Sequence, residues 1–230
     1  MKTIGLLGGM SWESTLEYYR ILNQLTQKEF GANHSCPCLI HSFDFQIIET
    51  LQHQQNWDAL SLLLVEASKK LEVSGADLLV ICTNTMHKLA DRIQDHIQIP
   101  LIHIADAVAW EIRKKGIKKV GLLGTKFTME EGFYKKKLLE NHQVKCIIPS
   151  GSERDIIHEI IYNELVKGIF KKESKEQFRK IIKKLKNRNA EGIILGCTEI
   201  PLLIKQKDCK ISLFDTTNIH AMSAFKQAIK

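Results

Sequence analysis

The sequence predicts an α/β protein made of two similar halves, each built on a parallel sheet. Short apolar runs of strand length alternate with longer segments of helical periodicity from one end of the chain to the other. Such alternation is typical of βαβ units, in which each helix returns the chain to the start of a parallel strand. The second observation is that the strand pattern of the first half recurs in the second half.

The predicted strands are uninterrupted apolar runs, as expected of strands that a parallel sheet buries on both faces. They cover residues 4–7, 39–42, 78–81, 101–104, 120–123, 193–195 and 211–214. Between them, apolar residues recur at helical spacing. The predicted helices cover residues 14–28, 57–73, 85–95, 106–115, 129–140, 155–167 and 174–187.

An internal repeat is the evidence for two halves. The segment IGLLG at 4–8 returns as VGLLG at 120–124, an offset of 116 residues (120 − 4), and Tyr18 and Tyr134 keep this register. The segment ADLLVICT at 76–83 returns as AEGIILGC at 190–197, an offset of 114 (190 − 76), and residues 99–102 and 210–214 give a weaker third match. Two such halves predict a pseudo-two-fold arrangement with the active site in the cleft between them, because ligands of open parallel sheets lie at the carboxyl ends of the strands.

The predicted domains follow from this repeat. The first comprises residues 1–100 together with 209–230, since the final segment is expected to pack against the first half. The second comprises residues 101–208. No linker-like or low-complexity stretch marks either boundary.

Composition narrows the class of protein. The chain has 230 residues, of which 44% are hydrophobic and 26% charged, a balance typical of a globular enzyme. Its net charge is +7, and lysines gather at 171–188, where Phe178, Ile181 and Leu185 recur at helical spacing. This segment predicts an amphipathic helix with a solvated basic face, so no nucleic-acid partner is expected. No apolar run reaches the ~18 residues of a membrane span, and no signal peptide is recognised, so we expect a cytoplasmic protein without a membrane partner.

The six cysteines are scattered along the chain and do not form a disulfide framework. Cys36 and Cys38 lie close to His41, but no second ligand pair stands at zinc-finger spacing. We therefore expect free thiols and no metal site.

Two matched loops carry the polar residues. CTNTMH at 82–87 and GCTE at 196–199 each follow a predicted buried strand and lead into a helix. The free N–H groups of a helix N-terminus suit a carboxylate, and the same position lowers the pKa of a cysteine from its usual ~8.5, which predicts a reactive thiolate at Cys197. The candidate ligand-binding side chains in the two loops are Thr83, Asn84, Thr85, Thr198 and Glu199.

The repeat also predicts which residue of the first loop faces a ligand. Asp77 to Thr83 and Glu191 to Cys197 are both six residues apart (83 − 77 and 197 − 191). Neighbouring residues of a strand point to opposite faces, so Cys82 and Thr83 do not both face the ligand. The register favours Thr83 as the counterpart of Cys197 and makes Cys82 a buried structural thiol, with Cys82 as the alternative.

These loops resemble the C-N-T and G-C-T-E motifs of the aspartate/glutamate racemase superfamily. GGMSWEST at 8–15, CTNTMHK at 82–88 and DTT at 215–217 resemble its L-aspartate/glutamate-specific branch. The resemblance covers essentially the whole chain and implies two Rossmann-like domains, an interdomain site, no cofactor and a homodimer. The sequence departs from the common pattern at Thr83, where the superfamily normally has cysteine.

The resemblance implies a two-base racemisation of aspartate or glutamate. Cys197 would remove Hα from the L-enantiomer, and Thr83 would deliver a proton to the opposite face. Met10 would bind substrate through its backbone, and Gln52 would reach in from the loop after the second strand. Glu199 replaces the histidine that cell-wall glutamate racemases carry after G-C-T.

Other interpretations stay open. Within the superfamily they are a broader amino-acid racemase, a hydantoin racemase or a maleate isomerase, and outside enzymology a non-catalytic carboxylate-binding protein. A dinucleotide loop is disfavoured because Gly5, Gly8 and Gly9 do not have G-x-G-x-x-G spacing. His87 and His220, like His103, are interpreted as structural polar residues, with a catalytic part as the alternative.

Overall fold

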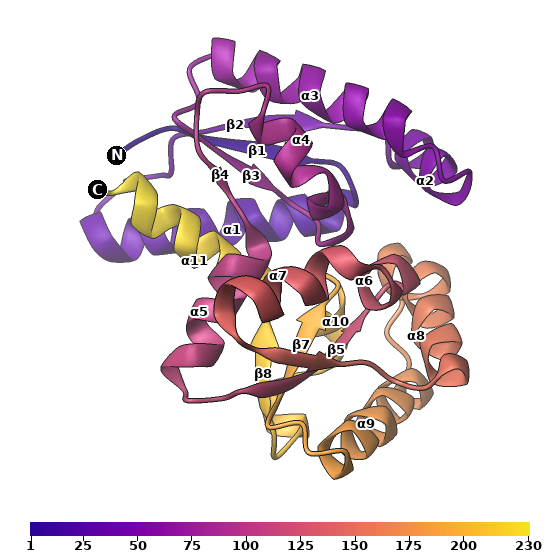
Figure 1. The fold of residues 1–230 in the computed structure, drawn as a ribbon. Coiled ribbons are helices and arrows are strands. Elements are labelled where there is room, and N and C mark those ends of the chain that lie inside the picture. The colour runs from indigo at the N-terminus through magenta and orange to yellow at the C-terminus, as the bar shows by residue number, and fades with distance from the viewer. The chain divides into compact units, whose positions relative to one another are not determined.

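The computed structural model describes all 230 residues and divides into two compact units. The first unit comprises Met1–His103 and His220–Lys230, and the second comprises Ile104–Ile219 (Figure 1). Each unit holds one four-stranded sheet, and the strands that are neighbours within each sheet run parallel.

The first sheet has the strand order β2-β1-β3-β4. Its strands are β1 Ile4–Gly8, β2 Cys38–Ser42, β3 Leu78–Ile81 and β4 Leu101–Ile102. The helices of this unit are α1 Trp12–Phe30, α2 Phe45–His53, α3 Trp57–Val73, the 3₁₀ turn η1 Thr85–Leu89, α4 Ala90–Gln94 and the C-terminal part of α11 Thr216–Ala228.

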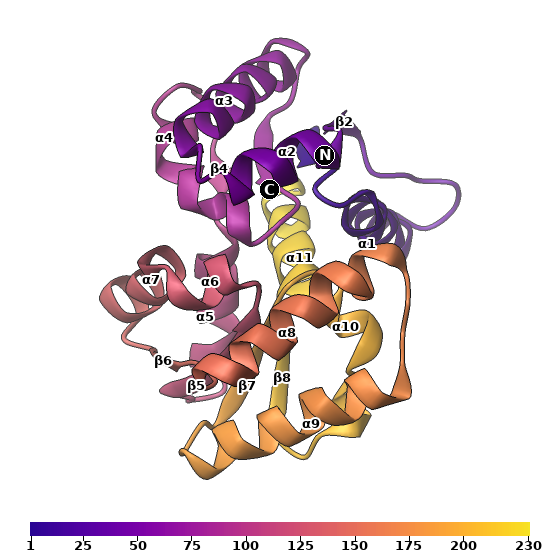
Figure 2. The same ribbon diagram turned by 90° about the vertical axis from the view of Figure 1, so that its right-hand side faces the viewer.

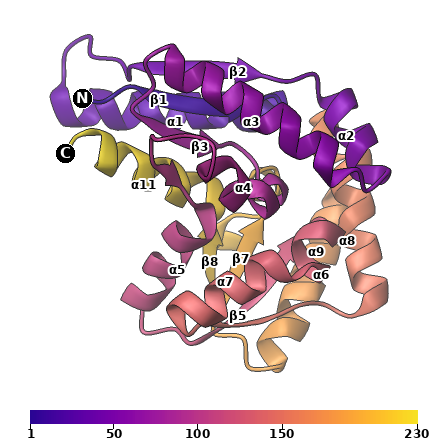
Figure 3. The same ribbon diagram turned by 45° about the horizontal axis from the view of Figure 1, so that its top comes forward.

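Side-chain alternation divides the first unit into two apolar layers. Ile4 and Leu6 of β1 pack with Tyr18 of α1 and Phe225 of α11, whereas Leu7 packs with residues of α3 on the other face. Figure 3 shows α3 on one side of the strands and α1 with α11 on the other. Both strand faces are thus buried, which is why β1 and β3 read as continuous apolar runs.

The second sheet repeats this topology with the order β6-β5-β7-β8. Its strands are β5 Lys119–Gly124, β6 Lys145–Ile147, β7 Gly192–Gly196 and β8 Ser212–Asp215. The helices and 3₁₀ turns are α5 Ile104–Lys114, α6 Lys126–Glu130, α7 Gly132–His142, α8 Gly151–Asn163, η2 Leu165–Lys167, α9 Lys172–Asn187, α10 Ile200–Leu203 and η3 Gln206–Asp208. Helices α8 and α9 pack against each other and against β5 (Figure 2). The predicted fold class, two similar α/β halves with parallel sheets, is confirmed.

The unit boundaries differ from the predicted ones. The first lies between His103 and Ile104, close to the expected residue 100, but the second lies between Ile219 and His220 and not near 208. The reason is that β8 pairs with β7 and so belongs to the second sheet. Only the end of α11 returns to the first unit, where Phe225 is buried in the core.

Some helices also differ from their predicted extents. The predicted helix 85–95 is a 3₁₀ turn followed by the short α4. The predicted helix 129–140 is two helices, because Glu131 adopts an extended conformation (φ −70°, ψ 151°) that interrupts it. The structure adds α2, β6, α10 and α11, which the sequence patterns did not predict.

Helix α9 has the predicted amphipathic character. Phe178, Ile181 and Leu185 are buried on one side, and the lysines of the helix are mostly exposed. None of the helices combines the length and the apolar character that a membrane-spanning segment requires.

Candidate active site

In the turn between β1 and α1, the backbone of Gly9 lies close to the backbone of Phe43. Gly9 has a positive φ of 79°, and a Cβ at this position would lie 2.2 Å from the carbonyl oxygen of Phe43, so only glycine fits. The Gly9 N–H donates to Thr15 Oγ1 at 2.8 Å, and the side chain of Ser11 caps the first turn of α1. These bonds fix the loop that presents the backbone of Met10.

This turn is tied to the end of β3 by one buried hydrogen bond. Ser14 Oγ donates to the carbonyl oxygen of Cys82 at 2.7 Å, and the Cys82 N–H donates to Leu7 O at 2.9 Å. The loops that follow β1 and β3 are therefore held together within the first unit.

Cys82 lies in the apolar core. It continues the alternation of Leu78 and Val80, which face α1 and α11, and it has no exposed surface. Burial raises the pKa of the Cys82 thiol far above its ordinary value, so this group is a neutral thiol at physiological pH. Thr83, the next residue, is half-buried.

Two other predicted ligand-binding residues of the first unit closely follow β3, but Gln52, which was expected in a loop, lies in a helix. Asn84 and Thr85 are buried at the start of η1, directly after Thr83. Gln52 is buried near the end of α2, the helix that follows β2. The side chain of Met10 packs into the core with Ile48 and Met86, which leaves only its backbone for a ligand.

In the second unit, Cys197, Thr198 and Glu199 form a compact polar group at the end of β7. Cys197 Sγ–H donates to Glu199 Oε2 at 2.9 Å, and Thr198 Oγ1 donates to the same oxygen at 2.9 Å. All three side chains are buried. The structure therefore brings together the three predicted residues of the second loop around one carboxylate oxygen.

The expected lowering of the Cys197 pKa is wrong for the protein without substrate. Burial raises the pKa of the Cys197 thiol well above its ordinary value, and the nearby charge of Glu199 and the hydrogen bond to it raise it further. Backbone N–H groups of Thr198 and Glu199 act in the opposite direction but are outweighed. The helix that follows, α10, has only four residues, so its N-terminus contributes little positive potential.

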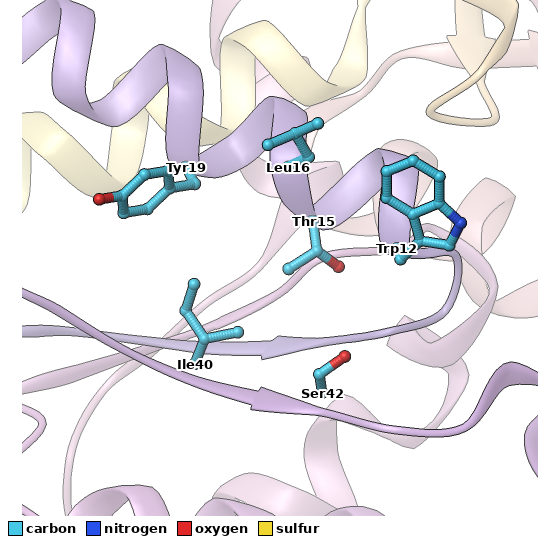
Figure 4. Close-up of a pocket in the computed structure, with 6 residues that line it drawn as sticks. All are labelled: Trp12, Thr15, Leu16, Tyr19, Ile40 and Ser42. Carbon is cyan, nitrogen blue, oxygen red and sulfur yellow. The ribbon is translucent and has the colours of Figure 1, made fainter.

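A separate hollow of about 220 Å³ lies on the first unit between α1 and β2. Figure 4 shows its lining, which consists of Trp12, Thr15, Leu16, Tyr19, Ile40 and Ser42. The lining is mostly apolar and offers hydroxyl groups but no carboxylate, thiol or imidazole. It therefore offers no thiolate, carboxylate or imidazole to act as the base that removes a proton from carbon.

Comparison with known proteins places the chain in a family. The sequence model of the Asp/Glu/Hydantoin racemase family matches residues 7–224. The chain belongs to this family. It is accordingly an isomerase of the racemase type that works without pyridoxal phosphate.

Individual relatives agree with this assignment. A crystal structure of a candidate Asp/Glu racemase from Yersinia pestis is 46% identical, covers 100% of both chains and superposes with a TM-score of 0.94. An aspartate racemase homologue from Pyrococcus horikoshii is 38% identical over 100% of both chains, with a TM-score of 0.87. A broad-specificity amino-acid racemase from Bacillus subtilis is 24% identical over 96% of this chain and 95% of its own length.

Two side chains near the loops after β1 and β3 were not among the predicted site residues, although a catalytic part was left open for His87. Ser14 ties the loop after β1 to the end of β3, and His87 hydrogen-bonds the backbone of Thr83. The signal for His87 was its spacing: it stands four residues after Thr83 and in the same short motif. Glu199 was expected to contact substrate, and the structure shows it bound to the thiol of Cys197.

Proposed function

We propose that this racemase interconverts the L- and D-enantiomers of aspartate and glutamate by two-base proton transfer at Cα. Cys197 acts on one face of the substrate and Thr83 on the other. The observation that supports this best is the buried Cys197–Glu199 pair at the end of β7. A thiol in direct contact with a carboxylate has a proton acceptor at hand, as an acid–base catalyst requires.

The proposed reaction begins with the transfer of the Cys197 thiol proton to Glu199. The thiolate then removes Hα from the L-substrate, and the electron pair of the Cα–H bond passes into the substrate carboxylate as an enolate. Thr83 donates its hydroxyl proton to the opposite face of Cα and regains one from solvent. Cys197 keeps the former Hα as its thiol hydrogen, and Glu199 releases to solvent the proton that it had accepted. Thr198, Asn84 and neighbouring backbone amides are the proposed donors that stabilise the enolate oxygens.

The groups proposed for the two faces of the substrate, a thiolate and a hydroxyl, differ in their chemistry. A thiolate is a competent base, whereas a threonine hydroxyl is a poor base but can protonate a strongly basic carbanion. Enantiomers have equal free energy in water, so kcat/KM must be the same in both directions. The asymmetry therefore shows in kcat and KM taken separately, with the L-enantiomer assigned to Cys197.

Aspartate and glutamate are proposed as substrates because the motifs at 8–15, 82–88 and 215–217 resemble the L-specific branch. Met10 through its backbone, Gln52 and Thr85 are the further proposed substrate contacts. A broad-specificity amino-acid racemase is the second candidate, since the Bacillus subtilis relative bears that description and matches nearly the whole chain. A homodimer is proposed on the family resemblance alone.

Incubation with single L-amino acids in D2O, without added cofactor, tests the function. We expect loss of Hα and appearance of the D-isomer for aspartate and glutamate only. Exchange across a wide amino-acid panel would favour the broad-specificity candidate, and no exchange with any amino acid would refute racemase activity on amino acids.

Three variants test the assigned residues in the same assay. Cys197→Ser and Thr83→Ala should both lose racemisation. Cys82→Ala should remain active because its thiol is buried in the core and away from the proposed chemistry. An inactive but folded Cys82→Ala protein together with an active Thr83→Ala protein would show that the register assignment is wrong.

A further inference from the structure

His87 makes two hydrogen bonds to the loop that carries Thr83. Its Nδ1 lies 2.8 Å from the carbonyl oxygen of Thr83, and its backbone N–H donates to Asn84 O at 3.1 Å. Because a carbonyl oxygen can only accept, Nδ1 must carry the hydrogen of this bond. The imidazole is buried on η1, immediately behind the loop.

Two further histidines surround His87. The ring of His103 lies 4.8 Å from it, centroid to centroid, and the ring of His220 lies 5.4 Å from it. His220 Nε2–H donates to Ile102 O at 2.6 Å, and His220 Nδ1 accepts from the hydroxyl of Tyr18 at 2.8 Å. The cluster therefore joins η1, the end of β4, α11 and α1.

Burial lowers the pKa of two of these histidines, His87 and His220. The pKa of His87 is held well below its ordinary value by burial first and then by repulsion from His103 and His220. Burial lowers the pKa of His220 to about 4. Hydrogen bonds to the backbone of Thr83 and of Ile102 raise the pKa of His87 but are outweighed.

We propose that His87 is a positioning residue for the proton donor: its Nδ1–H holds the Thr83 carbonyl and thereby fixes the Thr83–Asn84 peptide. This inference rests on the proposed function, which makes Thr83 the group that protonates Cα.

The physical link is the planarity of the peptide bond. Fixing the C=O of Thr83 fixes the plane it shares with the N–H of Asn84, which in a trans peptide points the opposite way. The same bond restricts the backbone from which the Thr83 hydroxyl extends. A hydrogen bond to the carbonyl also polarises the peptide, so the Asn84 N–H becomes a better donor to a developing enolate.

Three substitutions at His87 separate positioning from packing. In His87→Asn the amide nitrogen takes the place of Nδ1 and can donate to the Thr83 carbonyl. His87→Gln is the matched control, because its longer side chain places the amide at the position of Nε2. His87→Leu keeps comparable bulk and removes the donor, which leaves a half-buried carbonyl without this partner.

The decisive readout is the partition of the carbanion in D2O. With L-aspartate, Cys197 can return deuterium to the face from which it removed the proton, whereas inversion needs Thr83. We expect His87→Leu and His87→Gln to lower kcat for inversion by about 10- to 100-fold, as a misplacement of about 1 Å does. The ratio of deuterated L-isomer to D-isomer should rise several-fold in both and return toward the wild-type ratio in His87→Asn.

A merely structural role would lower the folded fraction and leave this ratio unchanged. An unchanged ratio in folded His87→Leu, or no recovery in His87→Asn, would overturn the inference. Nitrogen-15 NMR of the imidazoles tests it without any activity: the wild type should show hydrogen on Nδ1 of His87 at neutral pH, and an Nε2–H tautomer would refute it. Inactive wild-type protein would refute the proposed function instead, so the two failures are distinguishable.

Discussion

A thiol whose pKa is raised can act as a base only when a neighbouring group first accepts its proton. Cys197 meets this condition, because Glu199 Oε2 accepts its S–H hydrogen bond inside the protein. Thr198 donates to the same oxygen, which holds the carboxylate toward the thiol.

Glu199→Gln tests this pairing. The amide removes the negative charge that raises the Cys197 pKa, so the pH at which Cys197 reacts half-maximally with iodoacetamide should fall. Racemisation should nevertheless drop by about 10²- to 10⁴-fold, the usual contribution of an acid–base group. Mass spectrometry of the Cys197 peptide and a D-amino-acid assay measure the two effects.

The exposed Glu176, which pairs with Arg179, supplies the control substitution Glu176→Gln. Glu176→Gln should change neither the pH dependence of the Cys197 reaction with iodoacetamide nor the rate of racemisation. A Glu199→Gln protein that racemises at the wild-type rate would show that Glu199 is not the acceptor of the thiol proton.

At the scale of elements, the turn after β1 depends on Gly9, a position that only glycine can occupy. Gly9→Ala would place a methyl group 2.2 Å from the Phe43 carbonyl oxygen in a backbone conformation with φ 79°. We expect a loss of at least about 2 kcal/mol in the free energy of unfolding, from strain and displaced backbone together. The midpoint of urea unfolding measures it.

Gly168→Ala is the control, since Gly168 is in the left-handed region (φ 69°, ψ 20°) and has nothing within 4 Å of an added Cβ. It should cost only the left-handed strain, about 1–2 kcal/mol. Equal midpoints for the two variants would contradict the proposed clash at Gly9.

Strands were predicted where burial on both faces left an unbroken apolar run. Strands β1, β3, β5 and β7 are of this kind, whereas β6 has three residues and begins with an exposed lysine, so no pattern distinguished it from a loop. Helix α2 was missed as well. The prediction of a single helix over 85–95 was wrong. Helix propensity does not reveal that residues of η1 form a 3₁₀ turn, in which His87 hydrogen-bonds the backbone of Thr83.

The internal repeat made the two loops of the candidate site predictable from the sequence. The six-residue spacing from Asp77 to Thr83 and from Glu191 to Cys197 located both loops. The direction of the Cys197 pKa was not predictable, because it depends on where the Glu199 side chain turns after the strand ends. Contacts between side chains of different elements, such as His220 with Tyr18, leave no spacing signal in a sequence.

At the scale of the whole molecule, the chain passes between its two units at His103–Ile104 and at Ile219–His220. Both passages thus begin or end with a histidine of the buried cluster around His87. His87 bonds the loop after β3, and His103 and His220, which pack against His87, stand where the chain leaves and re-enters the first unit. Their protonation should therefore be coupled to the stability of that unit.

Acid should destabilise the protein through this cluster. The folded-state pKa of His220 is lowered to about 4, below the ~6.5 of an unfolded histidine, so the unfolded state binds more protons between these values. The stabilising contribution is complete above pH ~6.5 and is lost as the pH falls toward 4, at up to about 1.4 kcal/mol per pH unit for each such histidine. His220→Gln keeps a donor for Ile102 O but cannot titrate. Urea midpoints at pH 7, 6 and 5 should fall less steeply in this variant than in the wild type, and parallel curves would show that His220 does not carry the acid sensitivity.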